Sequence, residues 1–372
     1  MPMQKVESGL LECGVPLQCD IFSEDGKLLL RRGHVIVDQQ LLDNFLKRGL
    51  YIDTAVAASK AQEDLLGGHE YDPFWLWDRI VGKLGPLLRE HDTQEDLLNS
   101  VILLSRWVQL LNDRSRDAAL AAMILLTDQG RYAQLHSLHA ALLCDIVAVR
   151  LEWGEERRRS LVCAALTMNI SMVDTQQVLV EQVEPLTPEQ RQDIKLHPKA
   201  GADILNRAGV EDAVWLQAVL DHHETPLGYG YPNGIKEVGE EATLLRTADV
   251  FSAKVSPRTS RKPLSGAQAS RVLFTDPGMT SANPFVAALI KEVGIYPPGS
   301  FVKLANGETA IVYKRSDNAH TPVVLSLTNS QGTVEAKPIR RDTSRDEFKV
   351  ISIIPRENIM IRINPVSIWG AA

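Results

Sequence analysis

The spacing of hydrophobic residues divides the chain into a short mixed region, a long helical region and a strand-rich end. Two apolar runs within residues 19–30 flank a Glu-Asp-Gly turn, which predicts a β-hairpin. A helix is predicted over residues 38–48, ended by Gly49. We therefore expect a small α/β module at residues 1–55. Residues 56–74 have little periodicity and a Gly-Gly pair, which predicts a linker.

Apolar residues recur every three or four positions through residues 75–296, which predicts an almost wholly helical domain. Gly154 is expected to separate two of its helices. Thr187, followed by proline and then by Gln190, predicts a capped helix start. One apolar stripe predicts an amphipathic helix and consists of Leu135, Leu138, Leu142, Ile146 and Val149.

Strands are predicted beyond the last helices. The pair Asn306-Gly307 lies between two apolar runs and predicts a hairpin turn, and residues 323–325 and 349–354 add strands. We therefore expect a β-rich appendage over residues 297–372. The fold class is mainly α, with this appendage at one end and the α/β module at the other.

Composition limits the kind of partner. The 372 residues carry a net charge of −7, which argues against binding a nucleic-acid polymer, although a local basic pocket for a small anion remains open. The sequence has no run of 18 apolar residues and no secretory signal at its start, so we expect a cytoplasmic protein without a membrane partner. The four cysteines match no common zinc motif, and ordinary buried thiols are expected.

Five of the nine histidines fall in the helical region, at positions 136, 139, 197, 222 and 223. Together with Asp249 they offer imidazole and carboxylate groups from several helices, a donor set that suits iron, manganese or zinc. Taken singly, a histidine on such a helix is more often a packed or capping residue.

The order and spacing of these residues resemble the HD-GYP family of bacterial cyclic di-GMP phosphodiesterases. The resemblance implies an HD-type helical bundle and hydrolysis at two or three adjacent metals, with metal ligands at His136, His197, His222, His223 and Asp249. The matching segments are His136-Ser137, residues 186–201, His222-His223-Glu224, the loop Gly228-Tyr229-Gly230-Tyr231-Pro232, residues 248–251 and residues 257–261.

The His-Asp pair of the family is absent. Met168 stands where the family has a metal-binding histidine, Asn169 replaces the bridging aspartate, and Met172 replaces a lysine. An amide cannot offset the repulsion between two cations as a carboxylate does, and a thioether is a poor ligand for these metals. We therefore assign no catalytic residue and expect no efficient hydrolysis.

Some binding capacity remains. His197, His222 and His223 form a possible three-histidine site for one divalent metal (Fe, Mn or Zn), a known zinc-type arrangement. The alternative is that no metal binds and the histidines are hydrogen-bonded core residues.

Two loops offer further contacts. Arg258 and Arg261 can grip a phosphate by bidentate bonds, or they form a solvated surface run. The Gly-Tyr-Pro loop (residues 228–232) is intact, and in the family it is proposed to contact diguanylate cyclase domains. An exposed Tyr229/Tyr231 pair would suit such a protein contact, and a purely structural loop is the alternative.

The preferred interpretation is a degenerate HD-GYP signalling protein that acts by binding cyclic di-GMP or a protein partner. The alternative is a weak metal-dependent phosphodiesterase that uses His197, His222 and His223 with help from Asp249.

Overall fold

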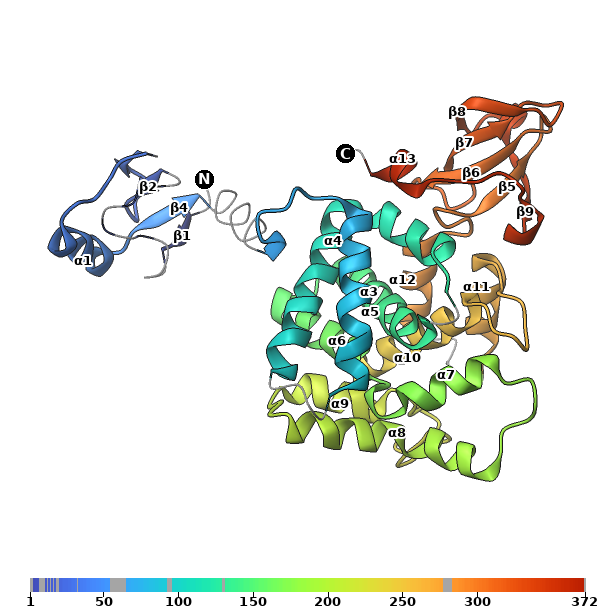
Figure 1. The fold of residues 1–372 in the computed structure, drawn as a ribbon, viewed down its shortest axis with the longest axis horizontal. Coiled ribbons are helices and arrows are strands. Elements are labelled where there is room, and N and C mark those ends of the chain that lie inside the picture. The colour runs from blue at the N-terminus through green and yellow to red at the C-terminus, as the bar shows by residue number, and fades with distance from the viewer. Residues whose placement is uncertain are drawn as a thin grey trace. The chain divides into compact units, whose positions relative to one another are not determined.

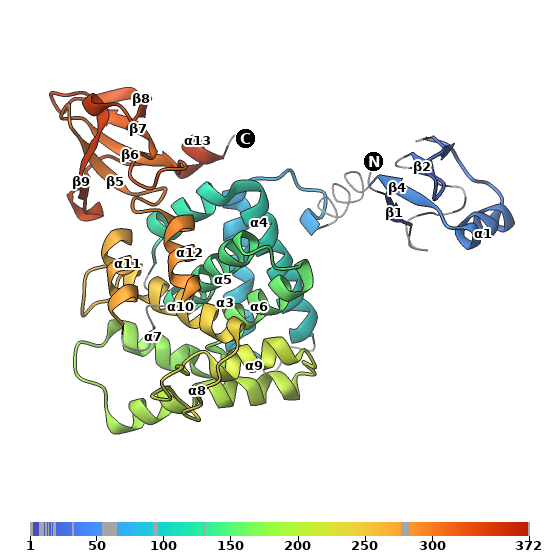
Figure 2. The same cartoon turned by 180° about the vertical axis from the view of Figure 1, so that it is seen from behind.

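The computed structural model describes residues 3–6, 11, 13, 15, 17, 20–31, 33–53, 65–91, 96–128, 131–276 and 283–370. The chain forms two compact units, Met1–Tyr71 and Asp72–Ala372 (Figures 1 and 2). Their boundary falls within residues 56–74, where the sequence predicts a linker.

The N-terminal unit is a four-stranded antiparallel sheet, in the order β1-β4-β2-β3, with one helix. Its elements are β1 (Met3–Lys5), β2 (Ile21–Phe22), β3 (Leu28–Leu30), α1 (Gln39–Arg48) and β4 (Tyr51–Asp53). The predicted hairpin is the β2–β3 pair, and the predicted helix is α1. Asp38 caps α1 by accepting two backbone N–H groups, and Gly49 ends it with a positive φ of 80°.

Helices form the main body of the second unit (Figure 1). They are α3 (Pro73–Arg89), α4 (Leu97–Leu125), α5 (Tyr132–Arg150), α6 (Glu155–Thr167), α7 (Val173–Glu181), α8 (Pro188–Arg207), α9 (Ala213–Asp221), α10 (Glu240–Val255), α11 (Gly266–Thr275) and α12 (Pro284–Val293). A short 3-10 turn, η2 (Ile170–Met172), joins α6 to α7. The predicted capping box of α8 is confirmed, because Thr187 and Gln190 each bond the other's backbone N–H.

Helix α5 lies at the centre of this bundle, and every residue from Tyr132 to Ala148 is buried. The prediction of a single apolar stripe is therefore wrong, because a helix surrounded on all sides by other helices has no solvent face. Among the described residues, α5 is the one helix long and apolar enough to cross a membrane, and 94% of the window that passes this test is buried inside the protein. A core helix of this kind is weak evidence for a membrane span.

The C-terminal part is a five-stranded antiparallel sheet in the order β8-β7-β6-β5-β9. Its elements are β5 (Phe301–Leu304), β6 (Thr309–Lys314), β7 (Val323–Thr328), β8 (Val334–Asp342), η3 (Asp346–Phe348), β9 (Val350–Ile354), η4 (Arg356–Asn358) and α13 (Pro365–Trp369). The hairpin predicted at Asn306-Gly307 joins β5 to β6.

This sheet is joined to the helices by partly buried ion pairs. Arg315 donates to Asp117 of α4 over 2.7 Å and to the Glu292 carboxylate of α12 over 3.1 Å. Backbone contact is also close, because a Cβ at Gly299 would lie 3.0 Å from the Cα of Ala121. The sheet and the helices therefore form one unit.

The described cysteines are free thiols. Cys144 and Cys163 are buried as expected, and Cys13 is partly buried, whereas Cys19 lies outside the described residues. Burial raises the pKa of Cys163 to about 12, so this thiol stays protonated and unreactive at neutral pH.

Candidate functional site

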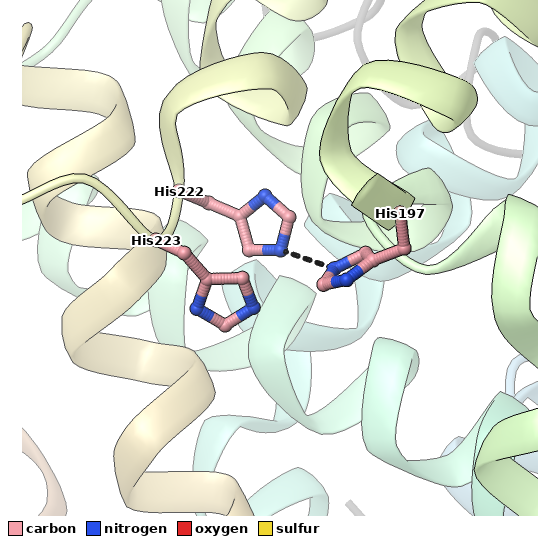
Figure 3. Close-up of side chains that lie close together, drawn as sticks. All are labelled: His197, His222 and His223. Atoms are coloured by element: carbon pink, nitrogen blue, oxygen red, sulfur yellow. Dashed lines mark hydrogen bonds between the residues drawn. The ribbon is translucent and has the colours of Figure 1, made fainter. Parts of the chain in front are cut away.

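Three histidines from α8 and the end of α9 converge on one point (Figure 3). One ring nitrogen from each of His197, His222 and His223 lies within 4.8 Å of the others. His197 and His222 are buried and His223 is partly exposed. Among the described residues this is the group of three or more side chains whose geometry suits a metal ion.

Hydrogen bonds set the protonation of two of these rings. Nδ1 of His197 lies 2.7 Å from the carbonyl of Ile194, and Nδ1 of His222 lies 2.6 Å from the carbonyl of Val219. Because a carbonyl only accepts, each Nδ1 must carry the proton, which leaves each Nε2 of the neutral ring with a lone pair. The two Nε2 atoms are 3.1 Å apart, and a dashed line joins them in Figure 3.

Two lone pairs facing each other at this distance need a cation between them or nearby. A proton is disfavoured, because burial and the neighbouring His222 lower the pKa of His197 to about 3. Burial likewise lowers the pKa of His222 and His223 below the ordinary histidine value. The donor set of three neutral imidazoles with fixed tautomers therefore fits a divalent metal.

His136 of α5 and Asp249 of α10 form a separate pair, with Nε2 2.7 Å from the carboxylate. Burial opposes ionisation of Asp249, but the hydrogen bond from His136 holds the pKa of that carboxyl below its ordinary value. The carboxylate also interacts electrostatically with His223 and His222.

The segment at the end of α6 is packed as ordinary core. Met168 is 0% exposed, Asn169 is 6% exposed and Met172 is 8% exposed. Ser171 donates to the carbonyl of His197 over 2.8 Å, which ties η2 to the helix that carries the cluster. The segment keeps its place beside the histidines while offering no imidazole or carboxylate.

The Gly-Tyr-Pro loop packs directly on the histidine pair. A Cβ at Gly230 would lie 2.4 Å from the Cα of Glu224 and 2.6 Å from the carbonyl of His223, so only glycine fits there. The buried Glu224 carboxylate accepts the backbone N–H groups of Asn233, Gly234 and Ile235 at 2.6 to 3.2 Å. These bonds fix the loop against the end of α9.

The two tyrosines of this loop differ. Tyr229 is 87% exposed, whereas the Tyr231 ring stacks on His223 with centroids 4.6 Å apart. Burial raises the pKa of Tyr231 above its ordinary value, so the phenol stays neutral. The expectation of an exposed tyrosine pair is therefore wrong for Tyr231, because the close approach of Gly230 draws the chain onto the histidines.

The basic loop (residues 257–263) borders an open cleft of about 530 Å³, whose far side includes Glu357. Arg258 donates to the hydroxyl of Tyr132, and Arg261 donates to the carbonyl of Ala253. Lys262 pairs with Glu357 over 3.0 Å. The predicted arginines therefore line the same cleft, each held by a contact with the protein.

His139 lies apart from the cluster. It is 2% exposed, and neither ring nitrogen has a hydrogen-bond partner among the described residues. Its ring lies 5.8 Å from that of Trp77, and burial lowers the pKa of His139 to about 3. This histidine is a neutral core residue.

Comparison with known proteins agrees with these features. Residues 98–276 match the family model described as an HD domain. A cyclic di-GMP phosphodiesterase of Pseudomonas aeruginosa, PA4108, is 28% identical over 201 residues, which cover 53% of this chain and 48% of that protein. Residues 98–276 are thus an HD domain.

Two further similarities cover a smaller part of this chain or have a lower sequence identity. A cyclic di-GMP phosphodiesterase of Thermotoga maritima is 32% identical to this chain over 109 residues, 28% of this chain and 30% of that protein. The chain thus spans less than half the length of the curated relatives it matches. A solved structure described as Bd1817, a HDG"Y"P protein from Bdellovibrio bacteriovorus, aligns with a TM-score of 0.49 at 18% identity, covering 77% of this chain and 98% of that chain.

The sequence did not point to two residues of the HD domain that contact His136. Tyr132 stacks on His136 with centroids 5.5 Å apart, and the Ser252 hydroxyl lies 3.1 Å from His136 Nδ1. A signal for Tyr132 was present, because residues four apart share one face of a helix. Ser252 has no such signal, since its contact with His136 depends on how α10 packs against α5.

Proposed function

We propose that this chain is a degenerate HD-GYP signalling protein that binds cyclic di-GMP or a protein partner without hydrolysing the nucleotide efficiently. The observation that carries the proposal is the contrast within one buried centre. The cluster of His197, His222 and His223 is intact, whereas Met168 and Asn169 offer no ligand for a second metal. Without a bridging carboxylate, two adjacent cations would repel each other with nothing to offset their charge.

The residues present fit one metal. His197, His222 and His223 would hold it, and Asp249 is placed to approach it by giving up its bond to His136. When bound, such an ion supplies a positive charge that attracts phosphate oxygens and can polarise a bound water. The protein itself holds the ring tautomers through the backbone carbonyls of Ile194 and Val219.

The basic loop supports nucleotide binding. Arg258, Arg261 and Lys262 border a cleft whose volume of about 530 Å³ falls in the range of small-molecule sites. Phosphate diesters carry the negative charge that guanidinium groups bind in bidentate fashion. We infer that the cleft receives a phosphate of the nucleotide.

The Gly-Tyr-Pro loop supports a protein partner. Tyr229 is 87% exposed and Leu227 is 45% exposed, so the loop presents apolar surface at its tip. Tyrosine is enriched at interface hot spots, and a diguanylate cyclase domain is the proposed partner. Tyr231 is occupied by its contact with His223 and is not part of this surface.

The test is to measure binding and turnover of cyclic di-GMP side by side. Protein reconstituted anaerobically with Fe(II) or Mn(II) is expected to bind the nucleotide in calorimetry while turning it over no faster than His223→Ala. Turnover that His223→Ala abolishes would contradict the proposal. It would favour the alternative, a weak phosphodiesterase that works with a single metal on the three histidines.

A further inference from the structure

Tyr132 contacts both the basic loop and the His136–Asp249 pair. It begins helix α5, is 4% exposed, and lies one turn before His136. Its hydroxyl oxygen accepts two N–H groups from Arg258, from Nη2 over 2.7 Å and from Nε over 3.2 Å. On the other side its ring lies nearly parallel to that of His136, at an interplanar angle of 7°.

The hydrogen bonds to Tyr132 orient the Arg258 guanidinium. A guanidinium has five N–H donors in a rigid fork, and Tyr132 engages the edge formed by Nε and Nη2. The remaining donors on Nη1 and Nη2 form the edge that binds a phosphate in bidentate fashion. Since Arg258 also lines the 530 Å³ cleft, one tyrosine oxygen holds this side chain ready for an anion.

The ring contact connects the same tyrosine to the metal centre. His136 is bonded to Asp249, whose carboxylate interacts electrostatically with His222 and His223. If Asp249 turned toward the cluster to help hold a metal, His136 would lose its acceptor and its ring could turn. The stacked Tyr132 ring is the next group along this path, and its hydroxyl would pass the displacement on to Arg258.

We propose that Tyr132 is a positioning residue that couples anion binding at the basic loop to metal binding at the histidine centre. This inference rests on the proposed function, since it requires that the chain binds both a metal and a phosphate-bearing ligand. Coupling between two sites is reciprocal, so the metal changes the affinity for the anion by the same factor as the anion changes the affinity for the metal.

Substitution of Tyr132 by phenylalanine separates the two contacts. Tyr132→Phe keeps the ring that stacks on His136 and removes the oxygen that holds Arg258. Tyr313→Phe in the C-terminal sheet is the matched control. The probe is guanosine monophosphate, a phosphate monoester that cannot be hydrolysed as a diester, titrated into the full chain with and without bound Mn(II).

The wild type is expected to bind guanosine monophosphate with an affinity that depends on the metal. Tyr132→Phe should weaken binding about 5-fold, because Arg258 is no longer pre-oriented, and should make the affinity independent of Mn(II). In an Arg258→Ala background, Tyr132→Phe should have no further effect on the binding of this probe. Tyr313→Phe should bind as the wild type does.

Two results would overturn the inference. They differ in whether they also bear on the proposed function. If the wild type binds Mn(II) and guanosine monophosphate but Tyr132→Phe keeps the metal dependence, the anion touches the metal directly and Tyr132 does not couple the sites. The proposed function then stands. If the wild type binds neither ligand, the nucleotide-binding part of the proposed function fails together with the inference.

Discussion

The two sides of the histidine centre have similar burial but opposite chemistry. On one side, His197 and His222 are 3% and 0% exposed and present lone pairs to each other. On the other side, Met168 and Asn169 are 0% and 6% exposed and present a thioether and an amide. The Ser171 hydroxyl still bonds the carbonyl of His197, so the two sides remain attached.

This difference shows that one buried centre can pack metal-binding side chains on one side and non-ligating side chains on the other. Methionine fills a buried position well because it is apolar and flexible, so the helical packing has no need of the family's histidine. Histidines that face each other with lone pairs are harder to explain by packing alone, because burial disfavours the proton that could join them. The proposed binding function therefore rests on the histidine side.

The largest expected effect comes from replacing Met168 and Asn169 by metal-binding residues. The double substitution Met168→His and Asn169→Asp returns an imidazole and a bridging carboxylate to the centre. Turnover of cyclic di-GMP with Fe(II) or Mn(II) should rise at least about 100-fold, the scale associated with one preorganised electrostatic group. Turnover is measured on protein shown by thermal unfolding to be folded. An unchanged rate in such protein would mean that the two sides are not the halves of one centre.

A second prediction concerns the Gly-Tyr-Pro loop, which packs on the histidine side of the centre. Gly230→Ala places a methyl group 2.4 Å from the Cα of Glu224 and forces the loop off His223. We expect the free energy of unfolding to fall by about 1–3 kcal/mol, as for other overpacked sites, and metal affinity to fall with it. Chemical denaturation and metal titration measure the two effects.

Gly82→Ala is the matched control for Gly230→Ala. A Cβ at Gly82 has nothing within 4 Å, and the residue lies inside helix α3. This substitution should raise the free energy of unfolding by about 0.5–1 kcal/mol, because alanine restricts the unfolded chain more than glycine does. Equal effects of the two substitutions would show that the loop accommodates a side chain.

A third prediction separates a histidine buried by packing from those aimed at a metal. The folded-state pKa of His139 is about 3, below its ordinary value of 6.5, so between these values the unfolded chain binds a proton that the folded chain does not. Stability is therefore full above pH 6.5 and falls as the pH drops through this window. From pH 7 to pH 5 this single group should cost about 2 kcal/mol.

His139→Leu should remove that part of the acid sensitivity without loss of metal binding. The measurement is the denaturation midpoint at pH 7 and pH 5, compared with the wild type. The exposed His320→Leu serves as the control and should leave the pH dependence unchanged. If His139→Leu lost metal, His139 would belong to the functional side of the comparison.

The smallest expected effect is at the basic loop. Glu357→Gln removes the acid that pairs with Lys262 at the edge of the cleft. Because exposed ion pairs are weak, affinity for guanosine monophosphate should rise only about twofold to fivefold, and less at high salt. Glu347→Gln in η3, an acid outside the lining of this cleft, is the control. Weaker binding after Glu357→Gln would indicate that Glu357 itself contacts the ligand.

Much of the fold could be predicted from local patterns. The capping box at Thr187, the ending of α1 at Gly49 and the hairpin at Asn306-Gly307 all depend on residues a few positions apart. The lack of metal-binding groups at Met168 and Asn169 was equally predictable. A thioether and an amide cannot act as an imidazole or a carboxylate, wherever the two residues lie in the fold. The apolar stripe of α5 led to the wrong expectation of a helix with one solvent-facing side. Periodicity does not reveal how many other helices surround a given helix.

Tertiary structure alone decided how these residues meet. The sequence determined which donors the centre has and which it lacks, because that depends only on residue identity. The facing Nε2 atoms of His197 and His222, the withdrawal of Tyr231 onto His223 and the contact of Tyr132 with Arg258 depend on distances between separate elements. Such distances are set by the packing of whole helices, which no local pattern of side chains records.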